Sequence, residues 1–143
     1  MDETPQTFLP DDAATAGLGR GLAALLPAGS LVLLQGDLGA GKTALARSMI
    51  RALLRDDRLE VPSPSFALVQ PYEGAGMVVR HADLYRLAAE RDLDELGLFD
   101  RPEAIVIVEW PERAPALLAE ADLIVELSIP PDGEGRLVRI RRR

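Results

Sequence analysis

Gly36-Asp37-Leu38-Gly39-Ala40-Gly41-Lys42-Thr43 is a complete match to G-x-x-x-x-G-K-[ST], the pattern of a glycine-rich loop that binds nucleotide phosphates. Lys42 is the only lysine of the chain, and the other 15 basic residues are all arginines. A compact ammonium fits between the β- and γ-phosphates, where a planar guanidinium is too large. The motif therefore predicts a phosphate site, and these residues are expected to line it: Gly36, Asp37, Leu38, Gly39, Ala40, Gly41, Lys42, Thr43 and Ala44.

The segments around the motif have the order that such a loop requires. Residues 30–35 form a short apolar run that is typical of a buried parallel strand, and residues 43–54 have helical periodicity. Glycines let the backbone N–H groups converge on the phosphates, and the helix N-terminus adds its positive dipole end. In this arrangement the Thr43 hydroxyl would bind a magnesium ion. The alternative is a glycine-rich turn that binds nothing.

Composition and length predict one soluble domain over residues 1–143, with 48% apolar residues and a net charge of -7. No cysteine and a single histidine exclude thiolate and histidine-rich metal sites, so metal binding would use oxygen ligands. We find no membrane span and no signal peptide, and therefore expect a cytoplasmic protein. The acidic balance argues against an autonomous nucleic-acid binder, so that any link to RNA is expected through partners.

Further elements are predicted along the chain. A helix is expected at 11–26, although three glycines weaken it, and the two prolines of 62–65 indicate an ordered loop. We expect antiparallel hairpins from 66–70 with 77–84 and from 123–129 with 137–140, a short acidic helix at 88–96, and a buried central strand at 104–110. The basic cluster 139–143 is interpreted as a solvated tail, with a binding site as the alternative.

Two carboxylates are candidates for nucleotide chemistry because each ends a predicted strand, where open α/β sheets bind their ligands. Glu109 is expected to hold magnesium, directly or through water, and its alternative is an exposed strand end. Asp83 could orient an attacking or metal-bound water, and its alternative is an ion pair with Arg80 or Arg86. His81 shares the face of Asp83 and is interpreted as structural rather than catalytic.

Five motifs together resemble those of the TsaE family, which contains the P-loop ATPases of bacterial tRNA threonylcarbamoyladenosine synthesis. In chain order they are residues 9–12 (LPDD), 36–43, 63–66 (SPSF), 81–87 (HADLYRL) and 108–111 (VEWP), and they span nearly the whole chain. The resemblance implies ATP hydrolysis, Mg²⁺ at Thr43 and Glu109, and an essential carboxylate at Asp83. It further implies a switch-like loop at 63–66 and the protein partners TsaD and TsaB.

The chain departs from the family pattern at two places. Ala44 replaces a second threonine after the loop, which removes one hydroxyl but keeps the backbone N–H. Ser65 in the switch-like loop and Ala67 just after it stand where the family commonly has threonine, so Ser63 and Ser65 are the only hydroxyls there. By the same resemblance, Asp12 and Arg136 match the family's acidic start and its Gly-Arg near the end, and the resemblance implies that they flank the adenine.

We therefore expect an α/β, P-loop NTPase-like, three-layer fold with a mostly parallel central sheet and antiparallel hairpin additions. The predicted activity is Mg-ATP hydrolysis, with Lys42, Asp83 and Glu109 as the catalytic residues. One alternative is a small-molecule P-loop kinase, for which little chain remains to build an acceptor site and a lid. Another is a nucleotide-binding switch without significant turnover; a guanine-reading Asn-Lys-x-Asp motif is absent, because the chain contains no asparagine.

Overall fold

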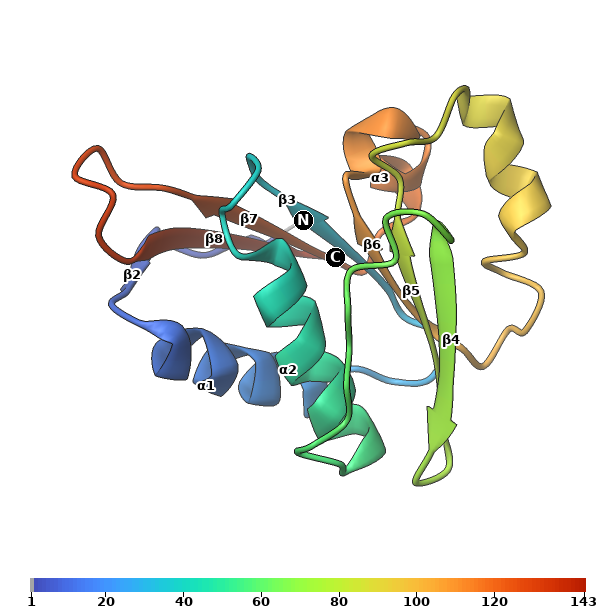
Figure 1. Cartoon of the computed structure of the whole chain (residues 1–143), viewed down its shortest axis with the longest axis horizontal. Helices are drawn as coiled ribbons and strands as arrows, with labels where there is room; N and C mark the ends of the chain where they lie inside the picture. The colour runs from blue at the N-terminus through green and yellow to red at the C-terminus, as the bar shows by residue number, and fades with distance from the viewer. Residues whose placement is uncertain (1) are drawn as a thin grey trace.

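A computed structural model describes residues 2–143 and contains one eight-stranded sheet with helices on both faces (Figure 1). The strands are β1 (Asp2–Glu3), β2 (Thr7–Leu9), β3 (Leu31–Gln35), β4 (Val69–Gly74), β5 (Met77–Asp83), β6 (Ile105–Glu109), β7 (Leu123–Ser128) and β8 (Arg136–Arg142). The α-helices are α1 (Asp12–Ala23), α2 (Lys42–Leu54) and α3 (Leu117–Glu120), and the 3₁₀ helices are η1 (Glu90–Leu96) and η2 (Pro111–Arg113).

The centre of the sheet is parallel and its margins are antiparallel, as the sequence predicts. The strand order is β1-β8-β7-β3-β6-β5-β4, with β2 also paired to β8. Strands β7, β3, β6 and β5 run parallel, while β4 and β8 return as hairpin partners of β5 and β7. β6 is buried along its whole length, which explains why its sequence is apolar at every position before Glu109.

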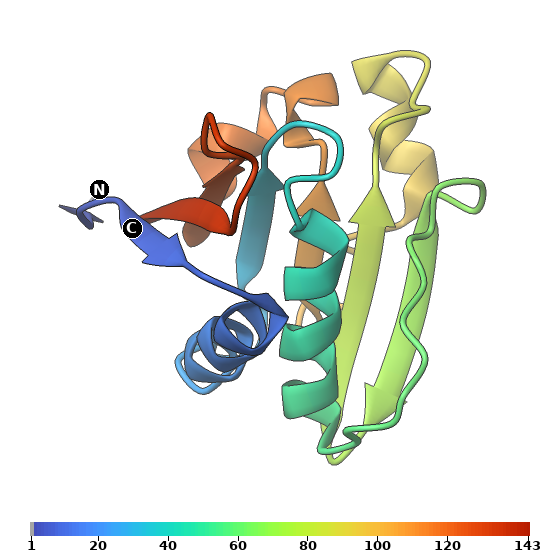
Figure 2. The ribbon, with the colours of Figure 1, turned by 60° about the vertical axis from the view of Figure 1, so that its left-hand side comes forward.

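Successive side chains of the central strands point to opposite faces of the sheet, and an apolar cluster lies on each face. The sheet and the segments that cover its two faces make three layers. On one face Val32, Leu34 and Ile107 pack under α1 and α2; on the other, Leu33 and Val108 pack under the segment that contains η1, η2 and α3. Figure 2 shows α2 lying along the sheet, with its N-terminal end next to the loop that follows β3. The fold thus places the motif at the carboxyl end of a central parallel strand.

The first hairpin differs from its predicted boundaries. β4 begins at Val69 and continues through Pro71 to Gly74, so the turn consists only of Ala75 and Gly76, which have φ of 51° and 76°. Proline lacks a backbone N–H, but it is tolerated in β4 because β4 is an edge strand, which has a neighbouring strand on one side only. The predicted strand at 66–70 was therefore wrong at both ends: residues 66–68 precede β4, and Pro71 to Gly74 belong to it.

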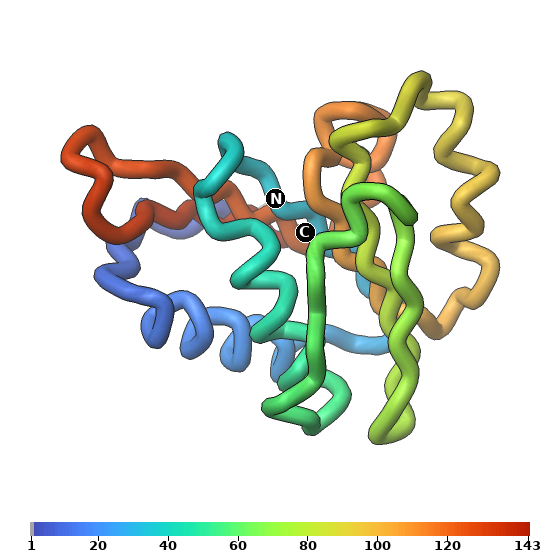
Figure 3. Tube along the Cα trace, viewed as in Figure 1, coloured from blue at the N-terminus to red at the C-terminus, as the bar shows by residue number. Residues whose placement is uncertain are grey.

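The basic cluster at the end of the chain is not a solvated tail. Arg139 to Arg142 lie within β8, between β7 on one side and the N-terminal strands on the other. Arg139 forms an ion pair with Glu3 at 3.3 Å, and the two chain ends lie side by side (Figure 3). β1 and β2 were not predicted, because they are two and three residues long and depend on pairing across the whole chain.

Within residues 2–143, no helix has the length and apolar content that crossing a membrane requires.

Candidate functional site

Glycine shapes the loop between β3 and α2 at two positions. Gly36 has φ of 151°, and a Cβ on it would lie 2.5 Å from the carbonyl oxygen of Leu127 in the neighbouring strand. Gly41 precedes α2 with φ of 104°, a left-handed conformation that side chains disfavour. The loop can therefore pass close to β7 and then turn directly into the start of α2.

Lys42 is 5% exposed and lies against its own loop. Its Nζ donates to the carbonyl oxygens of Gly36 and Asp37, the latter at 3.0 Å. The ring centroid of Trp110 lies 3.9 Å from Nζ, a cation–π contact that the sequence did not indicate. Burial lowers the pKa of the Lys42 amine, while the carboxylate of Glu109 opposes this effect. Lys42 is thus a buried cation held by carbonyls and an aromatic ring, at the position where the motif predicts phosphate contact.

Thr43 and Glu109 meet although 66 residues separate them in the sequence. The Thr43 hydroxyl donates to Oε1 of Glu109 at 2.8 Å, and the second carboxylate oxygen lies 2.6 Å from Nε2 of His81. Glu109 is 2% exposed, so the alternative of an exposed strand end is wrong. A hydroxyl and a carboxylate at this distance are hard oxygen ligands of the kind that Mg²⁺ prefers.

No group of three or more acidic or histidine side chains among residues 2–143 could hold a metal by itself. Magnesium sites in nucleotide-binding proteins differ from such clusters, because one or two protein ligands act together with the phosphates of the substrate. Thr43 and Glu109 fit that arrangement.

Asp83 lies beside Glu109, since the two are paired in register between β5 and β6. Its Oδ2 accepts from the Ser63 hydroxyl at 2.8 Å, and its Oδ1 accepts from the backbone N–H of Tyr85 at 3.0 Å. Asp83 forms no ion pair with Arg80 or Arg86 in the part of the chain described, so that alternative is wrong. The 63–66 loop is thus tied to a buried carboxylate at the predicted site.

These groups surround a cleft of about 470 Å³ at the carboxyl end of the sheet. Its lining includes the loop residues, both serines, both carboxylates and nearby aromatic and basic side chains: Leu38, Gly39, Gly41, Lys42, Thr43, Ala44, Ser63, Ser65, Asp83, Tyr85, Arg86, Glu109 and Trp110. Phe66 is 85% exposed beside this cleft and stacks with the guanidinium of Arg86 at 4.5 Å. Trp110 also packs against Tyr85, with 4.9 Å between ring centroids, so both rings pack beside the site.

Asp12 and Arg136 come together on the other side of the loop. They line a smaller hollow of about 290 Å³ with Gly39, Gly41 and Ala44. Arg136 donates from Nη2 to the Gly39 carbonyl oxygen at 2.9 Å, and Asp11 caps α1 through the Ala14 N–H. The predicted adenine-flanking pair therefore lies next to the phosphate loop. Its contact with adenine stays a prediction.

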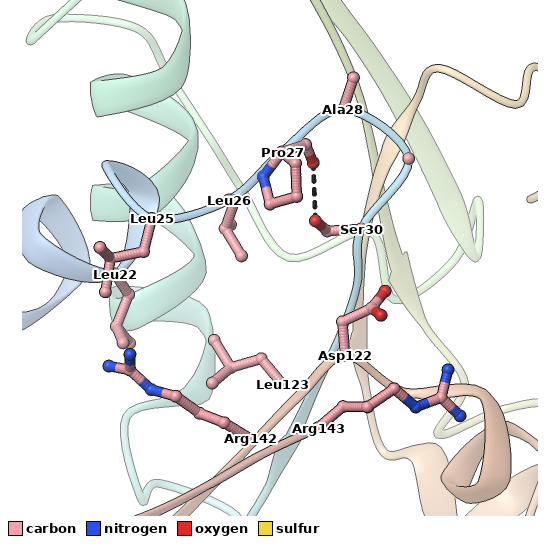
Figure 4. Close-up of a pocket in the computed structure, with 11 residues that line it drawn as sticks. Leu22, Leu25, Leu26, Pro27, Ala28, Ser30, Asp122, Leu123, Arg142 and Arg143 are labelled. Atoms are coloured by element: carbon pink, nitrogen blue, oxygen red, sulfur yellow. Dashed lines mark hydrogen bonds between the residues drawn. The ribbon is translucent and has the colours of Figure 1, made fainter.

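A separate hollow of about 290 Å³ lies at the opposite end of the sheet, before β3 (Figure 4). Leucines of α1 and the following turn line it together with Ser30, Asp122 and the last two arginines. None of the predicted site residues contributes to it.

Comparison with known proteins identifies the family. The family model described as "Threonylcarbamoyl adenosine biosynthesis protein TsaE" matches residues 9–137. The chain belongs to the TsaE family. This membership confirms the resemblance that the five motifs indicate, and nucleotide binding follows from it.

Relatives in the TsaE family cover most of the chain. The tRNA threonylcarbamoyladenosine biosynthesis protein TsaE of Synechocystis is 42% identical over 124 residues, 81% of this chain and 76% of that protein. The protein of the same name from Haemophilus influenzae is 35% identical, over 87% of this chain and 82% of its own. The Aquifex aeolicus TsaE protein is 34% identical over the full length of both.

Among solved structures, the crystal structure of Bacillus subtilis YdiB matches with a TM-score of 0.74 and 22% identity, over 99% of this chain and 86% of that one. This match confirms the predicted α/β P-loop-like fold.

Proposed function

We propose that this TsaE-family protein is a Mg²⁺-dependent ATPase that supports tRNA N6-threonylcarbamoyladenosine formation together with TsaD and TsaB. The observation that carries the proposal is the contact between Thr43 and Glu109 beside Lys42, which joins the phosphate loop to a buried carboxylate on the neighbouring strand. The family to which the chain belongs supports the biological process.

Each residue has a role that follows from its position. The loop N–H groups and Lys42 stabilise the charge that develops on the transferred phosphoryl group. For this, the ammonium exchanges the carbonyls of Gly36 and Asp37 for phosphate oxygens. Thr43 and Glu109 would hold Mg²⁺, which supplies charge neutralisation between the phosphates. Asp83 accepts hydrogen bonds and orients the attacking water.

The 63–66 loop gives this site a connection to its surroundings. Ser63 and Ser65 form a hydrogen bond with each other at 3.0 Å, and Ser63 binds Asp83, so a change at the carboxylate moves the loop. Phe66 carries that change to the surface, where a partner could detect it. ATP and ADP forms would then present different surfaces to TsaD and TsaB. We expect tRNA to be reached only through that complex, in the cytoplasm.

The reaction is tested by incubating the purified protein with ATP or GTP, with and without Mg²⁺, and measuring free phosphate. Slow release from ATP that requires Mg²⁺ is the expected result. Phosphate transferred to an added small metabolite, without matching free phosphate, would instead identify a kinase. Mg²⁺-dependent binding without release would leave a switch module that does not turn over.

The coupling is tested by calorimetry of the protein with a TsaD–TsaB assembly in the apo, ADP and non-hydrolysable ATP states. We expect the tightest binding in the ATP-like state, because linkage makes nucleotide state and partner affinity reciprocal. Equal affinities in all three states would remove the switch from the proposal, since a ligand without differential affinity shifts no population.

A further inference from the structure

His81 contacts a site residue, Glu109, but does not line the cleft. It is 0% exposed, and its Nε2 lies 2.6 Å from Oε2 of Glu109. The two side chains share one sheet face because Asp83 pairs in register with Glu109, and His81 is two residues before Asp83 on β5. His81 and Thr43 therefore bind different oxygens of the same carboxylate, Oε2 and Oε1.

The hydrogen bonds of Glu109 identify which ring nitrogen of His81 carries the proton. A carboxylate is an acceptor, so Nε2 must donate to it. Nδ1 is buried and has no hydrogen-bond partner among residues 2–143. The geometry thus requires a proton on Nε2.

We propose that His81 is a positioning residue for the magnesium ligand Glu109. Its N–H holds Oε2, which keeps the other oxygen, Oε1, directed at the Thr43 hydroxyl. Neighbours that hydrogen-bond a metal-ligating carboxylate orient it and tune its affinity, and their loss commonly costs 10–100-fold in metal binding. This inference rests on the proposed function, because it assumes that Glu109 and Thr43 bind Mg²⁺.

The Glu109 carboxylate is 2% exposed and accepts from two side chains, those of Thr43 and His81. Without His81 it would lose one of these two donors. A buried carboxylate in that situation either rotates toward another donor or becomes costly to keep charged. The first response moves Oε1 away from Thr43, and the second weakens the carboxylate as a ligand for Mg²⁺. The expected defect therefore concerns magnesium, and nucleotide binding without magnesium should change little.

The test compares two substitutions of similar size. His81→Gln keeps an N–H donor at about the place of Nε2, and His81→Leu fills the space without any donor. Nucleotide binding is titrated by calorimetry at a series of Mg²⁺ concentrations and in EDTA, and unfolding midpoints are measured without ligand.

We expect His81→Leu to raise the Mg²⁺ concentration for half-maximal nucleotide binding by about tenfold or more. Affinity in EDTA should stay near that of the wild type, and His81→Gln should recover most of the Mg²⁺ response. Equal losses in EDTA and Mg²⁺, or a wild-type Mg²⁺ response in His81→Leu, would overturn the positioning role. Absence of any Mg²⁺ response in the wild type would overturn the proposed function, and this inference with it.

If His81→Leu does not fold, the wild-type protein still provides a decisive measurement. His81 is the only histidine of the chain, so ¹⁵N NMR shows a single pair of imidazole nitrogens without mutagenesis. We expect Nε2 with a bound proton, both in the free protein and after addition of Mg²⁺ and ADP. A proton on Nδ1, with Nε2 bare, would contradict the donor role.

Discussion

Two glycines of α1 offer a matched test of how closely the helices pack. Gly19 lies where α1 contacts α2, and a Cβ placed on it would be 1.7 Å from the Ser48 Oγ, 2.7 Å from the Ser48 Cβ and 3.2 Å from the Met49 N. The Ser48 hydroxyl can rotate away, but the positions of the Ser48 Cβ and the Met49 N are fixed by the backbone of α2. Gly19→Ala therefore has to push the helices apart or distort one of them.

The two opposing contributions to Gly19→Ala are comparable in size. Overpacking of a tight contact costs about 1–3 kcal/mol, and alanine is favoured over glycine within a helix by about 1 kcal/mol. We expect the free energy of unfolding to fall by about 1 kcal/mol. Gly21 is two residues further along the same helix, is exposed, and would have nothing within 4 Å of an added Cβ. Gly21→Ala should therefore raise the free energy of unfolding by up to about 1 kcal/mol.

Urea unfolding followed by far-UV circular dichroism measures both changes against the wild type. The predicted result is a lower midpoint for Gly19→Ala and a higher one for Gly21→Ala, with similar slopes. A Gly19→Ala variant as stable as Gly21→Ala would refute the close approach of α1 and α2 at Ser48.

Further predictions concern Tyr72 and the two carboxylates. The Tyr72 hydroxyl is buried and has no hydrogen-bond partner in the described part of the chain, so Tyr72→Phe should stabilise the fold by about 1 kcal/mol in urea unfolding. Burial also raises the Tyr72 pKa above 10.0. Above pH 10.0 the unfolded chain loses this proton before the folded chain does, so the free energy of unfolding of the wild type should fall as pH rises. Tyr72→Phe should lack this contribution. Glu109→Gln should weaken Mg²⁺-dependent nucleotide binding about tenfold or more in calorimetry. Asp83→Asn should leave binding largely intact and slow phosphate release about 100-fold; opposite results would exchange the two roles.

Local sequence signals predicted the part of the fold that contains the motif. The apolar runs of β3 and β6 and the periodicity of α2 agree with the structure to within about two residues. The meeting of Thr43 with Glu109 was also predictable in outline, because parallel strands present their carboxyl ends at one edge of a sheet. Those signals depend on residues close in sequence or on a general rule of topology.

Contacts that depend on the whole chain were outside the reach of the sequence. Arg139 looked like part of a tail, because nothing nearby indicates that β1 and β2 pair with β8. Pro71 looked like a loop residue, because only the sheet order makes β4 an edge strand. Ser63 was predicted to lie in a loop. Its hydrogen bond to Asp83 was not predicted, because it depends on the path that residues 62–68 take past the end of β5. The same holds for His81, whose partner lies on the neighbouring strand.

The most direct test of the proposed ATPase is phosphate release from ATP by the wild type and by Lys42→Arg, each with and without TsaD and TsaB. Lys42 is 5% exposed and lies among the Gly36 carbonyl, the Asp37 carbonyl and the Trp110 ring, which leaves little room for a planar guanidinium. We predict slow Mg²⁺-dependent release by the wild type that rises with the partners, and no release above background by a folded Lys42→Arg variant. Near-wild-type release by Lys42→Arg, with or without partners, would contradict the assignment of this loop as the catalytic phosphate site.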